Sequence, residues 1–351
     1  MGESTETSPK ASPPRREEKE EEEVEPILRD QGPARWVLFP IDEQYKDIYD
    51  LHKATEAQNW MASEIDLSVD RQQYKEVLTA FERRLIDWTV SFFAASDGLV
   101  MENLNVNFSA EVRVPEILAF FAYQTHNEAV HSETYSLMID ALSPSRDKKM
   151  HLLQAFKENP CVERLIQWGN SWLDKSKHPF RVRNTAFVIY EALLFSGKFA
   201  VIFWFKKRNL LPGVCHANQL IARDESVHED AGVMIHGKLK HKVEPDVVRA
   251  MVDEALQIDL QYFGDLLSEP APGMNYELMA DYLRIVSNRI LGRFGCDPVY
   301  PHRPNSISDM MDTIGAENKT SFFEHRNPVY QSGYSKAATA GSRNFDIGAD
   351  F

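Results

Sequence analysis

The sequence contains little cysteine, no excess of basic charge and no long uninterrupted apolar run. Its 351 residues include three cysteines, Cys161, Cys215 and Cys296, which cannot form a disulfide framework and have no metal-binding spacing, so we expect a reduced, intracellular protein. The net charge of −14 argues against a general nucleic-acid binder, because phosphate binding needs a basic surface. No run of about 18 apolar residues is present, so no membrane span is expected. The polar N-terminus lacks a signal-peptide apolar region, which favours the cytoplasm and leaves a nuclear presence open.

Both ends of the chain differ in composition from its middle. Residues 1–35 are dominated by Ser, Pro, Lys and Glu, which predicts a disordered acidic tail. Ser8 and Ser12 each precede a proline, as in proline-directed kinase sites, but such short motifs leave phosphorylation open. Residues 327–351 are polar and rich in Gly and Ser, which predicts a flexible tail. Residues 36–326 between them form one predicted domain.

Apolar residues in this middle region recur with helical spacing nearly throughout. A long helix is expected from Tyr74 to beyond Asn103, with Leu85 and Phe92 on its buried stripe. Further helices are expected over residues 115–141, 151–175, 181–208, 213–240, 245–268 and 274–294, separated by Pro and Gly. The predicted fold class is therefore an all-α helical bundle.

Two copies of the pattern Glu-x-x-His are the most informative feature of the chain. The first consists of Glu128 and His131, and the second of Glu225 and His228. Residues three apart lie on the same face of a helix, so each glutamate and its histidine can reach the same ion. One such pattern arises often by chance, but its repetition in a fixed order does not.

Each Glu-x-x-His follows a lone carboxylate in an earlier apolar segment, Asp97 in the first half and Glu191 in the second. An unpaired buried carboxylate is costly, and a single one would be expected to pair with an arginine or to face solvent. Two matching halves favour two metal ions instead, because the ions supply the missing positive charge. Four carboxylates and two imidazoles on four helices are the ligand set of a dinuclear centre in a bundle, and such ligands suit iron or manganese.

Tyr135 lies four residues after His131, one turn further along the same helix face. Taken alone it is an ordinary core tyrosine. Phe195 and Phe199, on the inward face of the Glu191 helix, and Ile221, four residues before Glu225, are expected to enclose it in a dry apolar pocket. A shielded phenol beside metal ions is suited to one-electron oxidation and to a long-lived radical.

With these features the chain resembles the small, radical-bearing subunit of class I ribonucleotide reductase of the eukaryotic type, over residues 36–351. The residues that carry the resemblance are 92–98 (FFAASDG), 130–137 (VHSETYSL), 195–197 (FSG), 202–208 (IFWFKKR), 223–228 (RDESVH), 318–324 (NKTSFFE) and 349–351 (ADF). The resemblance implies a ferritin-like di-iron carboxylate bundle that supplies oxidising equivalents for the reduction of ribonucleotides to deoxyribonucleotides.

The resemblance also implies a role for each site residue. Two irons per chain are implied, manganese remaining open, one bound by Asp97, Glu128 and His131 and the other by Glu191, Glu225 and His228. Tyr135 would hold the stable radical. Trp60 and Asp224, with His131, would form the internal electron route, and Tyr330 would relay it to the large subunit. Phe345 and Phe351 would anchor the tail on that subunit, and the chain would form a homodimer or pair with another small subunit.

The sequence departs from the family pattern at several positions near these residues. Thr125, His126 and Asn127 replace residues that are usually apolar, and Lys198 stands where a small residue is usual. Residues 58–59 before Trp60 and Gly348 near the C-terminus also differ. These differences bear on radical stability more than on metal binding. Lys198 is expected near the surface or the dimer interface, with its ammonium group in water.

Three other functions compete with the reductase subunit. A di-iron oxygenase or oxidase could use the same bundle, but it would have no need of a relay arm with Tyr330 and Phe351. A metal-poor paralogue that only supports assembly would have lost ligands, and none is lost here. An iron-storage bundle would not need 351 residues with long tails.

Overall fold

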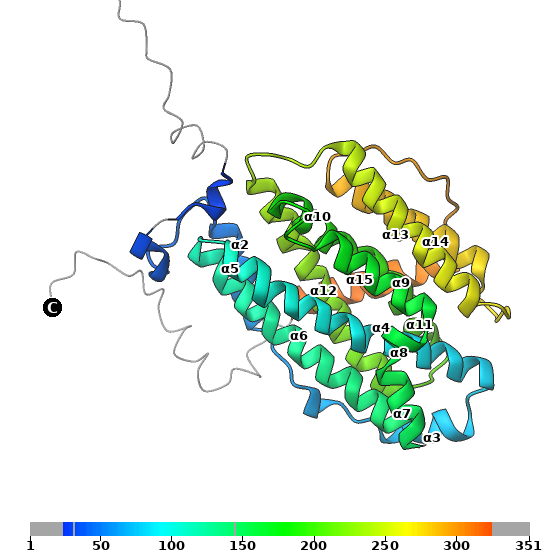
Figure 1. Cartoon of the computed structure of the whole chain (residues 1–351). Coiled ribbons are helices and arrows are strands. Elements are labelled where there is room, and N and C mark those ends of the chain that lie inside the picture. The colour runs from blue at the N-terminus through cyan, green and yellow to red at the C-terminus, as the bar shows by residue number, and fades with distance from the viewer. Residues whose placement is uncertain (1–23, 31, 144, 325–351) are drawn as a thin grey trace, which may run out of the picture.

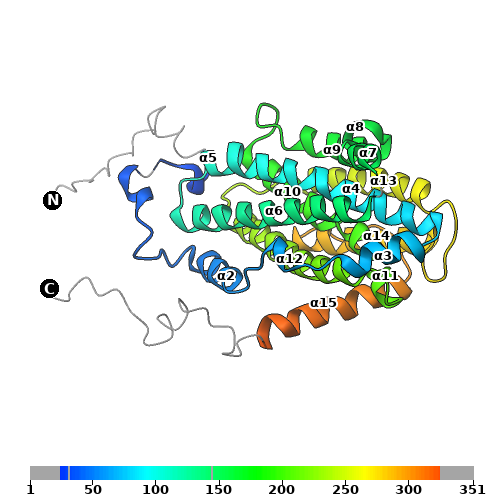
Figure 2. The same ribbon diagram turned by 90° about the horizontal axis from the view of Figure 1, so that it is seen from below.

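The computed structural model describes residues 24–30, 32–143 and 145–324, and its long elements in these ranges are all helices (Figure 1). The described residues contain one isolated β-bridge, Ala271–Met274, and no strand. The longest helices lie side by side with nearly parallel axes (Figures 1 and 2). This confirms the predicted all-α bundle. The two predicted tails fall largely or wholly outside the described residues.

The helices that form the site are adjacent in the middle of the bundle. They are α4 (Ala80–Glu102), α6 (Pro115–Leu142), α12 (Pro212–Lys238) and a continuous run made of α10 (Phe180–Ile189), the π-helical turn η5 (Tyr190–Leu194) and α11 (Ser196–Lys207). The turn η5 was not predicted. It replaces α-helical hydrogen bonding around Glu191, and such π-turns are frequent at functional sites.

The remaining elements surround these four. α13 (Pro245–Leu266) and α14 (Tyr276–Arg293) pack on the side of η5, while α15 (Ser306–Glu324) lies against α11, α12 and α14 (Figure 2). The others are η1 (Pro26–Leu28), η2 (Gly32–Trp36), α2 (Lys46–Glu56), η3 (Ala62–Glu64), α3 (Ser68–Glu76), η4 (Asn103–Phe108), α5 (Ser109–Glu111), α7 (Arg146–Leu153), α8 (Ala155–Glu158) and α9 (Pro160–Trp172).

Two predicted helices are divided in the structure. The helix expected from Tyr74 ends at Glu76, and α4 starts afresh after Thr79, whose hydroxyl accepts from the backbone N–H of Glu82 while the Glu82 carboxylate accepts from the backbone N–H of Thr79. This reciprocal cap sets the start of α4. The helix expected over 151–175 is divided among α7, α8 and α9. The break between α8 and α9 arises because Asn159 caps α9 and Pro160 occupies its first turn.

The run Phe180–Lys207 is long and apolar enough to cross a membrane by length and composition alone. However, 94% of its most apolar window is buried by the surrounding helices. It is therefore a core helix of the bundle, and it carries apolar residues on every face because every face is buried.

Lys198 lies in this core helix, and its predicted position at the surface is wrong. Its side chain is fully buried and forms an ion pair with Asp259 of α13, which is also fully buried. The ammonium nitrogen lies 4.4 Å from the ring centre of Tyr262 and 4.5 Å from that of Phe92. Burial lowers the pKa of Lys198 and raises the pKa of Asp259 to about 6. A counter-charge and aromatic faces thus replace water around the ammonium group.

Candidate metal centre and its tyrosine

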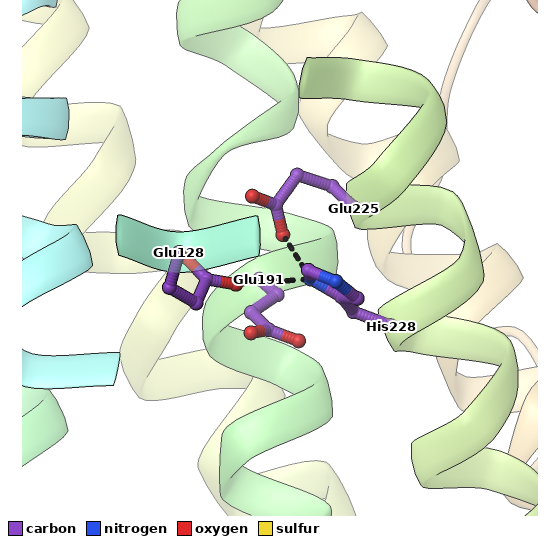
Figure 3. A group of neighbouring side chains, drawn as sticks. All are labelled: Glu128, Glu191, Glu225 and His228. Atoms are coloured by element: carbon purple, nitrogen blue, oxygen red, sulfur yellow. Dashed lines mark hydrogen bonds and ion pairs between the residues drawn. The ribbon is translucent and has the colours of Figure 1, made fainter. Parts of the chain in front are cut away.

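Glu128 on α6, Glu191 on η5 and the pair Glu225 and His228 on α12 point toward one another (Figure 3). Glu128, Glu191, Glu225 and His228 each offer a donor atom, and these atoms lie within 4.8 Å of one another. All four side chains are buried. The structure thus brings together residues up to a hundred positions apart in the chain, as the repeated motif predicted.

Glu128 and Glu225 occupy the middle of this group because each faces both histidines. Nδ1 of His228 lies 3.0 Å from Oε1 of Glu128 and 3.3 Å from Oε2 of Glu225. Nδ1 of His131 lies 3.1 Å from Oε1 of Glu225 and 3.6 Å from Oε2 of Glu128. Each of these two carboxylates therefore contacts imidazoles from both copies of the motif.

Asp97 and Glu191 are the outer carboxylates of the site. Asp97 lies outside the tight four-residue group but is almost fully buried on α4. Burial, followed by the charge of Glu128, raises its pKa, and burial with the charge of Glu225 raises that of Glu191. Oε1 of Glu191 accepts from Nε2 of Gln124 at 3.3 Å, a contact that the sequence did not indicate.

The electrostatics of these residues fit a bound cation. Among the described residues, Oδ2 of Asp97 and Oε2 of Glu191 are buried without a hydrogen-bond donor. Burial opposes ionisation of Glu128, but its contacts with His131 and His228 lower its pKa to about 2. Buried oxygens without donors are rare in folded proteins, and positive ions would satisfy them. Because the grouped donors are carboxylates and imidazole, they suit iron or manganese.

Tyr135 is fully buried one turn beyond His131. Its hydroxyl donates a 2.7 Å hydrogen bond to Oδ1 of Asn218 on α12. Phe93 stacks on its ring, with centroids 4.7 Å apart and planes 9° from parallel. Burial, followed by the charge of Asp97, raises the pKa of Tyr135 well above its usual range. Tyr135 therefore lies in a buried pocket that is covered by Phe93 and contains one polar partner, Asn218.

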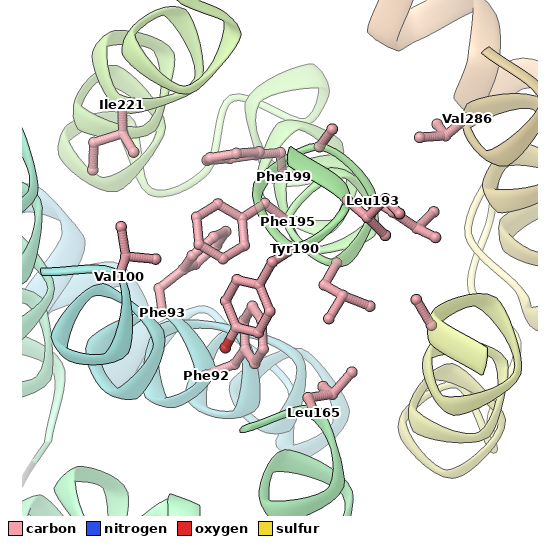
Figure 4. Packing of buried hydrophobic residues seen from close by; sticks show 14 of the residues in the cluster. Phe92, Phe93, Val100, Leu165, Tyr190, Leu193, Phe195, Phe199, Ile221 and Val286 are labelled. Atoms are coloured by element: carbon pink, nitrogen blue, oxygen red, sulfur yellow. The ribbon is translucent and has the colours of Figure 1, made fainter. Parts of the chain in front are cut away.

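The wall of this pocket differs in one respect from the expectation. Phe195 and Phe199 pack against Phe93, with centroids 5.2 and 4.9 Å away, so they form the layer behind the ring that covers Tyr135 (Figure 4). Phe93 was missed, although its position four residues before Asp97 places it on the same helix face. Ile221 is buried nearby (Figure 4).

Trp60 and Asp224 form a series of polar contacts with His131. Nε1 of Trp60 donates to Oδ2 of Asp224 at 2.8 Å, and Nε2 of His131 lies 3.4 Å from the same oxygen. Arg223 binds the other oxygen, Oδ1, at 2.9 Å. Burial disfavours the charged form of Asp224, but the contacts with His131 and Arg223 lower its pKa to about 2. The series of contacts from Trp60 to His131 is therefore continuous.

One of the three polar residues that precede Glu128, His126, contacts the residue next to Trp60. His126 is exposed, with Nε2 3.2 Å from Oδ1 of Asn59, and the Thr125 hydroxyl donates to the carbonyl of Phe121 at 2.9 Å. Asn127 is buried. Tyr330, Phe345, Gly348 and Phe351, together with Ser8 and Ser12, lie outside the described residues.

Comparisons with known proteins agree with this geometry. Residues 35–306 match the family model for the ribonucleotide reductase small chain. The sequence is 39% identical over 320 residues to the ribonucleoside-diphosphate reductase small chain of Nicotiana tabacum, covering 91% of this chain and 94% of the relative. It is 38% identical over 334 residues to the small chain of Trypanosoma brucei brucei, covering 95% and 97%. The ribonucleotide reductase Rnr4 homodimer from Saccharomyces cerevisiae superposes with a TM-score of 0.71 at 27% identity, covering 85% and 95%. The protein therefore belongs to the family of ribonucleotide reductase small chains.

Proposed function

We propose that this chain, as the small subunit of a ribonucleoside-diphosphate reductase, binds two iron ions and holds a stable radical on Tyr135. It passes the oxidising equivalent to a large subunit, which reduces ribonucleotides to deoxyribonucleotides for DNA synthesis. The observation that carries this proposal is the placement of Glu128 and Glu225 between both imidazoles, with a buried tyrosine one turn away. We place this activity in the cytoplasm.

Six residues would hold the metal ions. Asp97, Glu128 and His131 would hold one ion, and Glu191, Glu225 and His228 would hold the other. When bound, the ions would supply the one-electron oxidant that is needed to oxidise the phenol of Tyr135. Manganese has the same preference for these ligands, so metal loading decides which ion is used.

The residues around Tyr135 keep the oxidised ring from being quenched. Phe93 covers one face of the ring, and Phe195 and Phe199 fill the space behind it. Because water and small reductants cannot reach the phenol through this packing, a radical there can persist. Tyr135 is thus a store of oxidising equivalent.

The proposed electron-transfer route to Tyr135 consists of Trp60, Asp224 and His131. The Trp60 indole donates to Asp224, and its ring lies 6.1 Å from that of His131, with the planes 24° apart. Asp224, held by Arg223, fixes the indole and imidazole relative to each other. An electron can move inward along this path while Asp224 holds the indole N–H. Tyr330 in the tail would continue the path to the large subunit.

We expect anaerobic loading with ferrous iron to give about two ions per chain, because one ion would leave buried carboxylates uncompensated. Elemental analysis measures the number, and parallel loading with manganese compares the two metals. Glu225→Gln, which removes an anionic oxygen that lies between both histidines, should lower the number of bound ions per chain. Glu229→Gln is the matched control, since Glu229 lies one turn further on the same helix and is paired with Arg289. A wild-type value near one or zero would contradict the dinuclear site.

We expect deletion of residues 345–351 to abolish binding to the large subunit and turnover while leaving metal content and the Tyr135 radical unchanged. The tail has few apolar residues with which to pack on its own domain, but Phe345 and Phe351 can dock on a partner as aromatic anchors. Co-sedimentation and nucleotide reduction measure the effect. A variant with the same seven residues scrambled is the control, and a peptide of residues 345–351 should compete with the whole chain. Full turnover by the truncated protein would show that docking lies elsewhere.

A further inference from the structure

The hydrogen bond between Tyr135 and Asn218 links the site tyrosine to a residue with no role in the proposed metal site. The phenol is the donor, with 2.7 Å between its oxygen and Oδ1 of Asn218. Both side chains have no exposed surface, so water does not compete for the bond. A bond of this kind in a dry interior strongly constrains the direction of the hydroxyl.

The orientation of the Asn218 amide is set by its other contacts. Nδ2 donates to the backbone carbonyl of Val214 at 2.9 Å and lies 4.0 Å from the sulfur of Met138. A backbone carbonyl only accepts hydrogen bonds, so the amide nitrogen must face Val214 and the amide oxygen must face Tyr135. Turning the amide over would break the bond to Val214 and bring two oxygens together.

Asn218 is carried by the same rigid element as the second half of the metal site. It precedes Glu225 by seven residues and His228 by ten, so all three lie on one face of α12. The hydroxyl of Tyr135 is therefore tied to the helix that holds Glu225 and His228, although the tyrosine itself belongs to α6.

We propose that Asn218 is a positioning residue that favours the reduced form of Tyr135 over its radical. Oxidation of the phenol removes one electron and one proton. In the proposed function the electron goes to the oxidised dinuclear metal centre. The proton is taken up by a carboxylate of the site, whose charges act on Tyr135, because an amide oxygen is too weak a base to keep it. The O–H bond breaks and no new bond forms to Asn218.

The contact is favourable in only one of the two oxidation states. In the phenol, the hydrogen lies between two oxygens and attracts both. In the phenoxyl radical the same two oxygens face each other without it, and the bond of Asn218 to Val214 opposes the rotation that would present an N–H instead. Asn218 therefore makes the Tyr135 radical a stronger oxidant and a less persistent one.

The hydrogen bond itself can be tested without metal. Infrared difference spectra of metal-free protein with ring-labelled tyrosine, taken against Tyr135→Phe, isolate the C–O stretch of Tyr135. We expect the frequency of a donating phenol, and in Asn218→Leu that of a phenol without a partner. An identical frequency in both proteins would overturn the proposal, whatever the fate of the radical, so this measurement is independent of the proposed function.

The consequence for the radical is tested in the metal-loaded protein. Asn218→Leu should lengthen the half-life of the radical, in the absence of a large subunit, by a factor on the order of ten, as expected for loss of one hydrogen bond to the reduced state. The exchangeable-proton couplings in the electron-nuclear double resonance spectrum should be the same in this variant and in the wild type. The radical accepts no hydrogen bond from Asn218 in the wild type, and leucine has no donor. A half-life that is unchanged or shorter, or a coupling lost in the variant, would overturn the proposal.

Two further variants complete the test. Asn218→Asp keeps the shape of the residue but supplies a base that can retain the proton, so its radical should gain an exchangeable-proton coupling; absence of that coupling contradicts the proposed contact. This variant carries the test if Asn218→Leu does not fold.

Asn184→Leu is the matched control, because Asn184 is an equally buried asparagine whose Nδ2 donates to the carbonyl of Gly232. Its radical should decay at the wild-type rate, and an equal lengthening there would show a general packing effect. Failure of the wild-type protein to form any radical would refute the proposed function but leave the infrared result standing.

Discussion

Replacing Tyr135 by phenylalanine should abolish the radical signal and all ribonucleotide reduction while leaving about two metal ions per chain. Phenylalanine fills the same space beneath Phe93 but has no hydroxyl to lose a proton and an electron. Electron paramagnetic resonance after loading with iron and oxygen measures the signal. Because the large subunit has no other source of oxidising equivalent in the proposed function, turnover should fall to the background of the assay.

The matched control for this change is Tyr262→Phe. Tyr262 is another fully buried tyrosine, packed on Phe92 and on Lys198 rather than on Phe93, so its loss should leave the radical signal intact. A full tyrosyl signal in Tyr135→Phe would show that another tyrosine carries the radical. Tyr190 would then be the first candidate, since it is buried beside Glu191 and donates to Ser96 at 3.0 Å.

The centre of the site was predictable because its residues repeat at helical spacing. A glutamate and histidine three apart must share a helix face, and the second copy in the same order indicated that two such faces meet. The structure brings these residues together around Glu128 and Glu225. The apolar surroundings of Asp97 and Glu191 indicated their burial for a similar reason, because a carboxylate in an apolar helix needs a partner.

Contacts between helices that share no spacing rule were not predictable. Asn218 has the right spacing to Glu225, but nothing in the sequence shows that its amide oxygen meets the hydroxyl of Tyr135 across two helices. Helix ends were missed for a related reason. The capping residue Thr79 interrupts a stretch whose apolar spacing runs on without a break, and a local hydrogen bond decides the boundary.

The buried position of Lys198 also depends on a contact between helices. Its sequence neighbours are apolar, so a surface position with a buried stem was the natural prediction. The ion-pair partner, Asp259, is 61 positions away on α13. We expect Lys198→Met to lower the free energy of unfolding by about 3–5 kcal/mol at neutral pH, because the buried Asp259 carboxyl loses its counter-charge and must either stay charged or take up a proton in the core. Urea denaturation measures the loss.

The pH dependence of that loss identifies its cause. Burial already raises the pKa of Asp259 above its unfolded value, to about 6, and removal of the ammonium group should raise it further. A group whose pKa is raised on folding contributes stability that is present below the unfolded pKa and is lost as the pH rises through the folded pKa. The deficit of Lys198→Met should therefore be smaller at about pH 5 than at about pH 8.

A second substitution should reverse most of the damage. Lys198→Met combined with Asp259→Leu removes both charges and leaves apolar side chains among Phe92, Tyr262 and Phe263, so its stability should approach or exceed that of the wild type. Lys53→Met is the control, since Lys53 forms an exposed ion pair with Glu56 whose loss should change stability by less than about 1 kcal/mol. If the single and double variants were equally destabilised at every pH, the effect would come from packing around Lys198, and the buried charge of Asp259 would not be its cause.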